Sequence, residues 1–268
     1  MPNPPLALTI AGFDPCGGAG LQADLKTFQA HGVYGLSAAT TVTVQNTLGV
    51  AEIFPLPAPI IRRQIDNLLE DFTIQAVKIG MVGSSENIPV ISRLIKEHQI
   101  KQVVLDPIIK SQSGFIFLDD EGQNALLDEL LPLCLLITPN LKEAEQLCSF
   151  PIKNQPDMLK AAKYLHNRGA KNILIKTGML NKNQCSDLFS AGANEVFRHW
   201  NQLDGQSPHG TGCILAAAIT ANLALGQSLA DSIGNAQIYL QKLLKSPLKI
   251  GHGYPLINLT HYSKKCII

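Results

Sequence analysis

The chain has 268 residues, and 22 basic against 21 acidic side chains give it a formal net charge of +1. Apolar residues make up 46% and charged residues 16%, which indicates a well-buried globular protein and excludes a disordered one. The sequence has no basic block and no apolar run long enough for a bilayer, so neither nucleic acid nor a membrane is an expected partner. Neither a linker nor an internal repeat divides the sequence, which predicts a single domain over residues 1–268.

The cysteines and the first residues favour a cytoplasmic location. The six cysteines form no C-x-x-C pair and no zinc spacing to histidine, so they are interpreted as reduced, mostly buried thiols. The amino-terminal residues lack a basic start followed by an apolar stretch, and therefore predict no secretory signal.

Strand-like and helix-like segments alternate along the chain. Short apolar or β-branched runs predict strands at 6–11, 36–44, 76–79, 103–105, 135–138 and 172–176. Helical spacing or runs of helix formers predict helices at 21–31, 60–72, 85–98, 121–131, from 139 onward, 158–168 and 214–226. Residues 108–117 are expected to form a loop, and 187–189 with 195–198 a short hairpin. This alternation predicts an α/β fold whose central, mostly parallel sheet carries helices on both faces.

Polar residues follow the predicted strands at their carboxyl ends. In parallel sheets these ends meet at one edge, where ligands bind. The sequence is therefore expected to bring together residues that lie far apart along the chain: Asp14, Gln45, Asp106, Asn140, Lys176 and the turn at 210–213.

The segment His209-Gly-Thr-Gly-Cys213 is typical of a tight turn that opens a helix. The first N–H groups of a helix have no intrahelical partner, and the macrodipole places partial positive charge there. We therefore interpret Gly210, Thr211 and Gly212 as a binding site for a phosphate or an oxyanion. Cys213 falls in the first helical turn, where the pKa of a thiol is expected to be lowered.

Several familiar sites are excluded. Gly18-Ala-Gly20-Leu-Gln-Ala23 fits the dinucleotide fingerprint, but no acidic residue stands about 20 positions later to hold a ribose. A Walker loop is absent because the chain contains no Gly-Lys dipeptide, and G-x-S-x-G and H-E-x-x-H are absent too.

The remaining parts suit phosphoryl transfer: an anion site, a lysine, and carboxylates for a magnesium ion. Each part alone also has a purely structural interpretation. Asp106 could cap a turn before Pro107, and Lys176 could be an ordinary charge at a strand end. Glu143 could complete a capping box with Asn140.

Taken together, the motifs resemble the hydroxymethylpyrimidine/phosphomethylpyrimidine kinases of thiamine biosynthesis, within the ribokinase-like superfamily. The resemblance spans nearly the whole chain. It rests on Ala7-Leu-Thr-Ile-Ala-Gly12, Asp14-Pro15, Gly17-Gly-Ala-Gly-Leu-Gln-Ala-Asp-Leu-Lys-Thr-Phe28, Gly32-Val-Tyr-Gly35, Gln45-Asn-Thr47, Lys78-Ile-Gly-Met81, Val104-Leu-Asp-Pro107, Ser113-Gly114, Ile137-Thr-Pro-Asn-Leu141, Glu143-Ala144 and His209-Gly-Thr-Gly-Cys213.

This resemblance implies a ribokinase-like fold and ATP-dependent phosphorylation of 4-amino-5-hydroxymethyl-2-methylpyrimidine, and then of its monophosphate. It implies that the pyrimidine pocket is lined by Gly12, Asp24, Gln45 and Met81. An amide such as that of Gln45 suits an aminopyrimidine because it both donates and accepts hydrogen bonds.

The resemblance also assigns the catalytic parts. Asp106 and Glu143 would serve Mg²⁺, Asn140, Lys176 and Thr211 would bind ATP, and 210–213 would hold the transferred phosphoryl group. Cys213 stands where sugar kinases of the superfamily carry an aspartate base, and as a thiolate it could take the proton of the hydroxymethyl group. A homodimer is implied as well.

The chain departs from the family pattern at Phe13, Cys16, Thr177, Met179 and Gln237. Phe13 is expected to narrow the pocket, and loss of a late lysine at 237 to weaken ATP binding. Two rival functions therefore stay open: a pyridoxal or pyridoxine kinase, and a degenerate pyrimidine-binding protein without activity.

Overall fold

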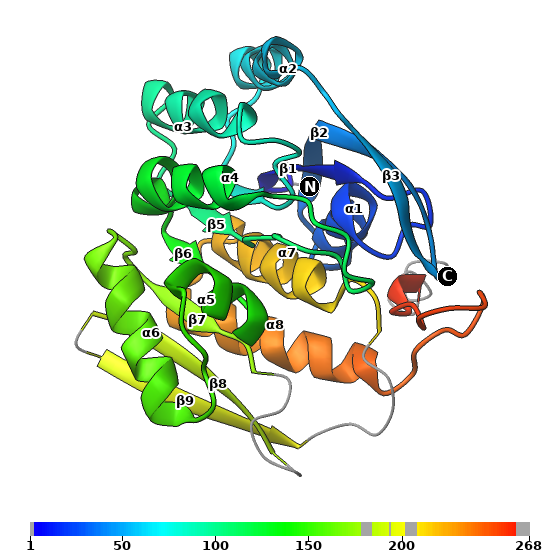
Figure 1. Cartoon of the computed structure of the whole chain (residues 1–268). Helices are drawn as coiled ribbons and strands as arrows, with labels where there is room; N and C mark the ends of the chain where they lie inside the picture. The colour runs from blue at the N-terminus through cyan, green and yellow to red at the C-terminus, as the bar shows by residue number, and fades with distance from the viewer. Residues whose placement is uncertain (1–2, 178–183, 193, 202–207, 261–268) are drawn as a thin grey trace.

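The computed structural model describes residues 3–177, 184–192, 194–201 and 208–260. Within these ranges the strands form one sheet in the order β3-β2-β1-β4-β5-β6-β7-β8-β9 (Figure 1). Their bounds are β1 Leu6–Phe13, β2 Tyr34–Asn46, β3 Gly49–Pro55, β4 Ala76–Ile79, β5 Val103–Leu105, β6 Leu136–Ile137, β7 Ile173–Ile175, β8 Gln184–Ala191 and β9 Asn194–Asn201.

In the order of the sheet, the six strands β2, β1, β4, β5, β6 and β7 run parallel. Strands β3, β8 and β9 are antiparallel to their neighbours. The short central strands β4, β5 and β7 are buried along their whole length, as expected for strands that are covered on both sides. The predicted α/β fold with a mostly parallel sheet is confirmed.

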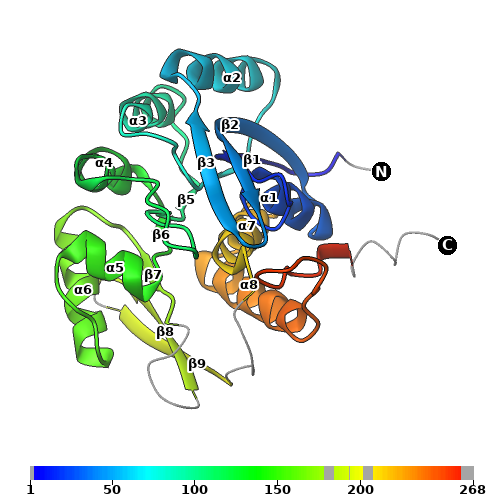
Figure 2. The same ribbon diagram turned by 45° about the vertical axis from the view of Figure 1, so that its right-hand side comes forward.

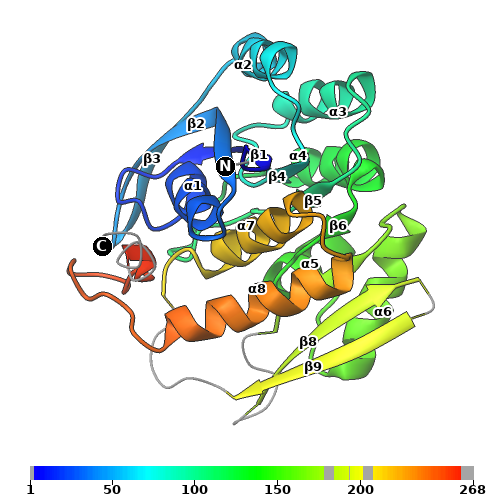
Figure 3. The same cartoon turned by 180° about the vertical axis from the view of Figure 1, so that it is seen from behind.

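Helices cover both faces of this sheet, and an apolar core fills each side. One face carries α2 (Ala58–Asp71), α3 (Asn87–Glu97), α4 (Asp120–Ala125), α5 (Leu141–Cys148) and α6 (Gln155–Asn167), together with a π-helical turn at Leu126–Leu130 and a 3-10 turn at Leu131–Leu133. The other face carries α1 (Gly20–Ala30), α7 (Thr211–Ala224) and α8 (Leu229–Leu244), which Figure 3 shows from behind.

Helix α7 is the most deeply buried helix of that face. Every residue from Cys213 to Ala224 is buried, because α1, α8 and the sheet enclose it. Five alanines along it leave room for this close packing. No helix of the described ranges is long and apolar enough to cross a membrane.

The structure extends or adds to several predicted elements. Strand β2 is longer than expected, and β3, for which the sequence gives no prediction, pairs with it as an antiparallel edge hairpin, which lies toward the viewer in Figure 2. Strand β3 lacks a regular alternation of buried and exposed residues, so periodicity could not reveal it. The predicted helix 121–131 is split into α4 and the following turns ahead of Pro132. Helix α8 lies in a stretch without any prediction.

Candidate active site

The carboxyl ends of the central strands bring the polar residues to one edge of the sheet. Each exit is fixed by the neighbouring strand: the Asp106 N–H donates to the Ile79 carbonyl at 2.8 Å, and the Thr138 N–H to the Leu105 carbonyl at 2.9 Å. The Lys176 N–H donates to the Pro139 carbonyl at 2.9 Å. Residues after β5, β6 and β7 therefore lie side by side, as the alternation of elements predicts.

The amino end of α7 meets this edge through a turn that only glycine can form. Gly210 has φ +84°, and a Cβ placed on it would lie 1.8 Å from the Gly18 carbonyl oxygen. A Cβ on Gly212 would lie 3.1 Å from Lys176 Nζ and 3.5 Å from Asp106 Oδ2. The helix begins at Thr211 without a side-chain cap, and its first turn lies beside the Lys176 and Asp106 side chains.

Lys176 and Asp106 form the charged centre of the site. Lys176 Nζ lies 2.7 Å from Asp106 Oδ1, and the Thr138 hydroxyl donates to the same oxygen at 3.0 Å. Burial alone would raise the pKa of Asp106, but the lysines Lys176 and Lys78 outweigh it and hold this pKa below its usual value. Burial likewise opposes the charge of Lys176, yet Asp106 and Glu143 raise its pKa. Both groups are therefore charged at neutral pH.

Asn140 and Glu143 form the capping box that the sequence left as an alternative. Asn140 Oδ1 accepts from the Glu143 N–H at 2.9 Å, and Glu143 Oε2 accepts from the Asn140 N–H at 2.7 Å. Burial raises the pKa of Glu143 to about 7, with Lys176 lowering it and Asp106 raising it. This carboxyl group thus caps α5 and also lies within the electrostatic field of the Lys176–Asp106 pair.

Cys213 occupies the predicted place in the first turn of α7, but its expected pKa is wrong. Burial raises the pKa of this thiol to about 12; Lys78 lowers it, whereas Asp106 and Asp24 raise it. The thiol is only 6% exposed, and the partial charge of the helix does not offset this desolvation. Cys213 is a neutral thiol in this structure, not a thiolate.

Asp24, which the resemblance assigns to the pyrimidine pocket, lies deeper than the other residues of that set. Its side chain is fully buried, with Oδ2 2.9 Å from Lys78 Nζ and 2.6 Å from the Thr9 hydroxyl. Oδ1 is buried without a hydrogen-bond partner. Asp24 lies behind the site, where it compensates the buried charge of Lys78, whose pKa it raises against the effect of burial.

The other residues assigned to the pyrimidine pocket lie at the exits of β1, β2 and β4. A Cβ on Gly12 would lie 2.2 Å from the Met81 methyl carbon, so a side chain at this position would displace the end of Met81. The Gln45 amide nitrogen lies 2.8 Å from His209 Nε2, which links β2 to the glycine turn.

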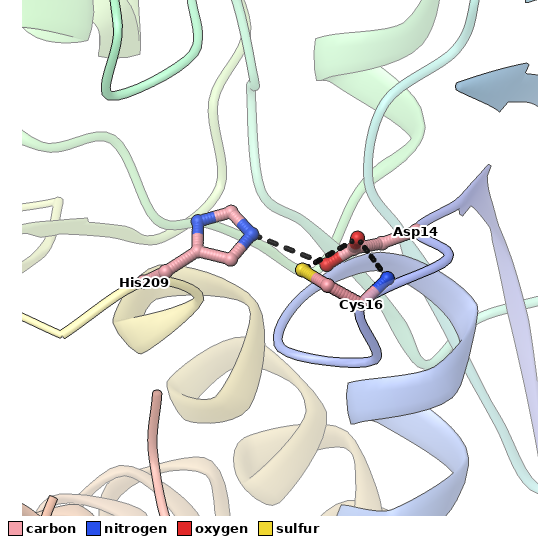
Figure 4. A group of neighbouring side chains, drawn as sticks. All are labelled: Asp14, Cys16 and His209. Carbon is pink, nitrogen blue, oxygen red and sulfur yellow. Dashed lines mark hydrogen bonds and ion pairs between the residues drawn. The ribbon is translucent and has the colours of Figure 1, made fainter. Parts of the chain in front are cut away.

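Asp14 anchors the loop after β1, a role that the sequence did not predict. Its carboxylate accepts from the N–H groups of Cys16, Gly18 and Ala19 at 3.0, 3.2 and 2.8 Å, and from the Cys16 thiol at 3.0 Å. His209 Nε2 lies 3.2 Å from Asp14 Oδ2 (Figure 4). A loop before α1 and a turn before α7 are thereby joined by side chains as well as by backbone packing.

The departures from the family pattern have local structural roles. Asp187 accepts from the Thr177 N–H at 3.0 Å and from the Gln237 amide at 2.9 Å, so both residues belong to one buried polar network. Phe13, a further departure, lies at the surface and is 41% exposed. Met179 lies outside the described residues.

Asp106 and Glu143 fit a magnesium ion by the chemistry of their donor atoms. Mg²⁺ prefers hard oxygen ligands and is often held by one or two carboxylates together with substrate phosphates. Asp106 Oδ2 faces Gly212, and Glu143 Oε1 has no hydrogen bond to the described residues. Each carboxylate thus keeps one oxygen for a metal ion.

The lack of space for a side chain at Gly210 gives a testable prediction about the stability of the turn. Gly210→Ala and Gly226→Ala both place alanine at a positive φ, +84° and +81°, but only the first would meet backbone. We expect Gly226→Ala to lower the free energy of unfolding by about 1–2 kcal/mol and Gly210→Ala by more than about 3 kcal/mol. Urea unfolding of both variants checks this, and equal losses would contradict the tight packing of Gly210 on Gly18.

Comparison with known proteins agrees with this geometry. A family model described as phosphomethylpyrimidine kinase matches residues 14–258. A hydroxymethylpyrimidine/phosphomethylpyrimidine kinase of Haemophilus influenzae is 40% identical over 268 residues, covering 98% of this chain and 100% of that protein. The crystal structure of phosphomethylpyrimidine kinase from Clostridium difficile has a TM-score of 0.78 at 38% identity, covering 89% of this chain and 99% of that one. The pyridoxal kinase of Staphylococcus aureus, in complex with AMP-PCP and pyridoxal, has a TM-score of 0.89 at 29% identity, covering 98% and 96%. The chain belongs to the phosphomethylpyrimidine kinase family.

Proposed function

We propose that this protein transfers the γ-phosphoryl group of ATP to the hydroxyl of 4-amino-5-hydroxymethyl-2-methylpyrimidine, and then phosphorylates the monophosphate to the diphosphate for thiamine biosynthesis. The observation that carries the proposal is the Lys176–Asp106 pair beside the uncapped amino end of α7. Phosphoryl transfer needs little covalent chemistry from a protein, but it needs positioned donors and charges around the transferred group.

The phosphates would be held by two groups of donors. The N–H groups of Gly210, Thr211 and Gly212 would receive the transferred phosphoryl group, because they lie at the positive end of α7. Lys176, Asn140 and Thr211 would bind the phosphates of ATP. Asp106 and Glu143 would hold Mg²⁺, which when bound neutralises charge that develops on the phosphates.

The pyrimidine would lie between the exits of β1, β2 and β4. Gln45 would hydrogen-bond to the ring, and Gly12 together with Met81 would provide a flat apolar surface. Asp24 would act indirectly, by pairing with the charged Lys78, since its own side chain is fully buried.

Cys213 would serve the two phosphorylation steps unequally. The first step uses a hydroxyl, whose proton must leave during the reaction. The second uses a phosphate oxygen, and a phosphate monoester carries most of its second negative charge at pH 7 because its second pKa is about 6. A general base is therefore needed for the first step only. Cys213 would act as this base only after its thiol has lost its proton to solvent, and the thiolate would then take the proton of the hydroxyl; Lys78 favours the thiolate, whereas burial opposes it.

One rival has specific support. The Staphylococcus aureus pyridoxal kinase resembles this chain in fold over nearly its whole length. Pyridoxal also carries a hydroxymethyl group on a nitrogen heteroaromatic ring, so the same site could phosphorylate it.

Substrate turnover tests the proposed function. The protein is incubated with Mg-ATP and, separately, hydroxymethylpyrimidine, its monophosphate and pyridoxal, and ADP release is measured. We expect turnover on both pyrimidines, and its loss in Asp106→Asn. Turnover on pyridoxal alone would assign the rival activity. Pyrimidine binding without turnover would assign a degenerate binding protein.

The two phosphorylation steps differ in their need for a general base, so we expect Cys213→Ala to slow them unequally. We expect this change to lower kcat for hydroxymethylpyrimidine by about 10²–10⁴-fold, the usual contribution of a general base. Turnover of the monophosphate should fall by less than about tenfold, because its nucleophile carries no proton to remove. Cys134→Ser, which removes another buried thiol, is the control. Equal losses in both steps would contradict the role of Cys213 as a base.

We propose a homodimer formed through the hairpin edge of the sheet. The register pairs Phe13 with Val42 and Val42 with Phe54, and these apolar side chains are 41%, 41% and 54% exposed. Val44 extends the stripe along β2, and β3 is the edge strand. A second copy would cover both the apolar stripe and the open edge.

We also place the protein in the cytoplasm, since the described cysteines Cys16, Cys134, Cys148 and Cys213 are all free.

Val42→Glu tests this interface. A buried, unpaired charge should convert the dimer to a monomer, whereas Leu225→Glu, at a comparably exposed residue of the α7 end, should leave the dimer intact. Sedimentation velocity of the two variants and the wild type measures the mass. A monomeric wild type, or a Val42→Glu variant that stays dimeric, would refute the proposal.

A further inference from the structure

Three side chains with different metal-binding chemistry meet where the loop after β1 contacts the turn before α7 (Figure 4). Asp14, Cys16 and His209 each offer one ligand atom, and the three atoms lie within 4.8 Å of one another. Cys16 Sγ is 3.0 Å from Asp14 Oδ1, and His209 Nε2 is 3.2 Å from Asp14 Oδ2. Asp14 is buried, whereas Cys16 and His209 are partly exposed, so an ion can reach the cluster from solvent.

This ligand set differs from the Asp106–Glu143 pair in kind. Two carboxylates suit Mg²⁺, but a thiolate with an imidazole and a carboxylate suits a softer divalent cation such as Zn²⁺. Three protein ligands with one position left for water is a common zinc arrangement.

Part of the spacing already suits such an ion. Zinc bonds of about 2.0 Å to oxygen and nitrogen and about 2.3 Å to sulfur, at tetrahedral angles, separate an oxygen from a nitrogen by about 3.3 Å and from a sulfur by about 3.5 Å. His209 Nε2 stands 3.2 Å from Asp14 Oδ2, whereas Cys16 Sγ stands 3.0 Å from the other oxygen, Oδ1. An ion bound to Oδ2 therefore requires the Cys16 side chain to turn toward that oxygen, within a cluster whose ligand atoms already lie within 4.8 Å of one another.

The surrounding hydrogen bonds orient the Asp14 carboxylate in advance. Gly18 and Ala19 donate their N–H groups to Oδ2 at 3.2 and 2.8 Å, and the Cys16 N–H donates to Oδ1. Partners of this kind around a ligand fix its direction and raise metal affinity.

We propose that Asp14, Cys16 and His209 form a binding site for one thiophilic divalent cation of the Zn²⁺ class, separate from the magnesium site. On binding, the metal–sulfur bond replaces the Cys16 S–H bond, and the released proton passes to the solvent buffer. The ion then ties the loop 14–20 to the turn that opens α7.

The bound ion also affects the pyrimidine pocket. His209 Nε2, which would bind the metal, lies 2.8 Å from the Gln45 amide nitrogen. Nε2 can either accept a hydrogen bond from this amide or donate one to Asp14 Oδ2, depending on the tautomer, and a nitrogen that binds zinc can do neither. The ion therefore frees Gln45 from His209, and zinc binding and the orientation of Gln45 become linked.

Zinc titration of the full, tag-free and reduced chain tests the site. Calorimetry with Zn²⁺ in excess Mg²⁺ is expected to show one site in the wild type, weakened about 100-fold or more in Cys16→Ser and in His209→Gln. Cys16→Ser is a mild change, because serine can keep the hydrogen bond to Asp14 Oδ1. Cys134→Ser, which alters a buried thiol remote in sequence, serves as the matched control and should bind like the wild type.

Cobalt absorption gives an independent measurement of the ligand atoms. Co²⁺ replaces Zn²⁺ in such sites, and a thiolate ligand adds a charge-transfer band in the near ultraviolet. We expect the band in the wild type and in Cys134→Ser, and its loss in Cys16→Ser. Unchanged zinc affinity in Cys16→Ser, the absence of a saturable site in the wild type, or removal of zinc by Mg²⁺ would each overturn the proposal.

Discussion

The close approach of two backbone segments, at Gly18 and Gly210, holds the amino end of α7 at the site. The Gly210 Cα faces the Gly18 carbonyl with no room for a side chain, and this contact fixes the start of α7 against the loop before α1. Since α7 is enclosed by α1, α8 and the sheet, the position of its amino end cannot drift. Its unpaired N–H groups are thereby held beside Lys176 and Asp106 without any side-chain cap that would compete with a bound anion.

Burial and charge pairing act against each other throughout this edge, and the balance differs from residue to residue. Asp106 stays ionised because two lysines outweigh its desolvation. At Glu143 burial outweighs the attraction of Lys176, and Asp106 adds to the effect of burial, so the pKa of this carboxyl rises to about 7. Cys213 faces carboxylates as well as Lys78, and burial dominates. One sheet edge thus holds a charged acid, an acid poised near neutrality and a neutral thiol.

Periodicity and turn chemistry were enough to predict the α/β fold and the strand ends that carry Asp106, Asn140 and Lys176, because these depend on local sequence. Strand β3 was not predictable, since an edge strand with mostly exposed residues has no apolar pattern. The depth of Asp24 and the raised pKa of Cys213 were missed for another reason: both depend on how far α1 and α7 sink into the core, and short motifs do not specify burial. A lysine inside the apolar strand Ala76–Ile79 was the one available signal that a buried acid must lie opposite.

Two residues that depart from the family pattern, Thr177 and Gln237, are held in place by hydrogen bonds near the proposed ATP site. Thr177 follows β7 and Gln237 lies on α8, and both hydrogen-bond to Asp187 on β8. Gln237, which stands where the family pattern has a lysine, donates its amide to the buried Asp187 at 2.9 Å and so contributes a hydrogen bond to this network. The charged centre of the site does not depend on this network: Lys176 Nζ lies 2.7 Å from Asp106 Oδ1, and both groups lie beside Gly212 in the first turn of α7. Because burial strengthens electrostatic interactions, this pair is the central electrostatic element of the site.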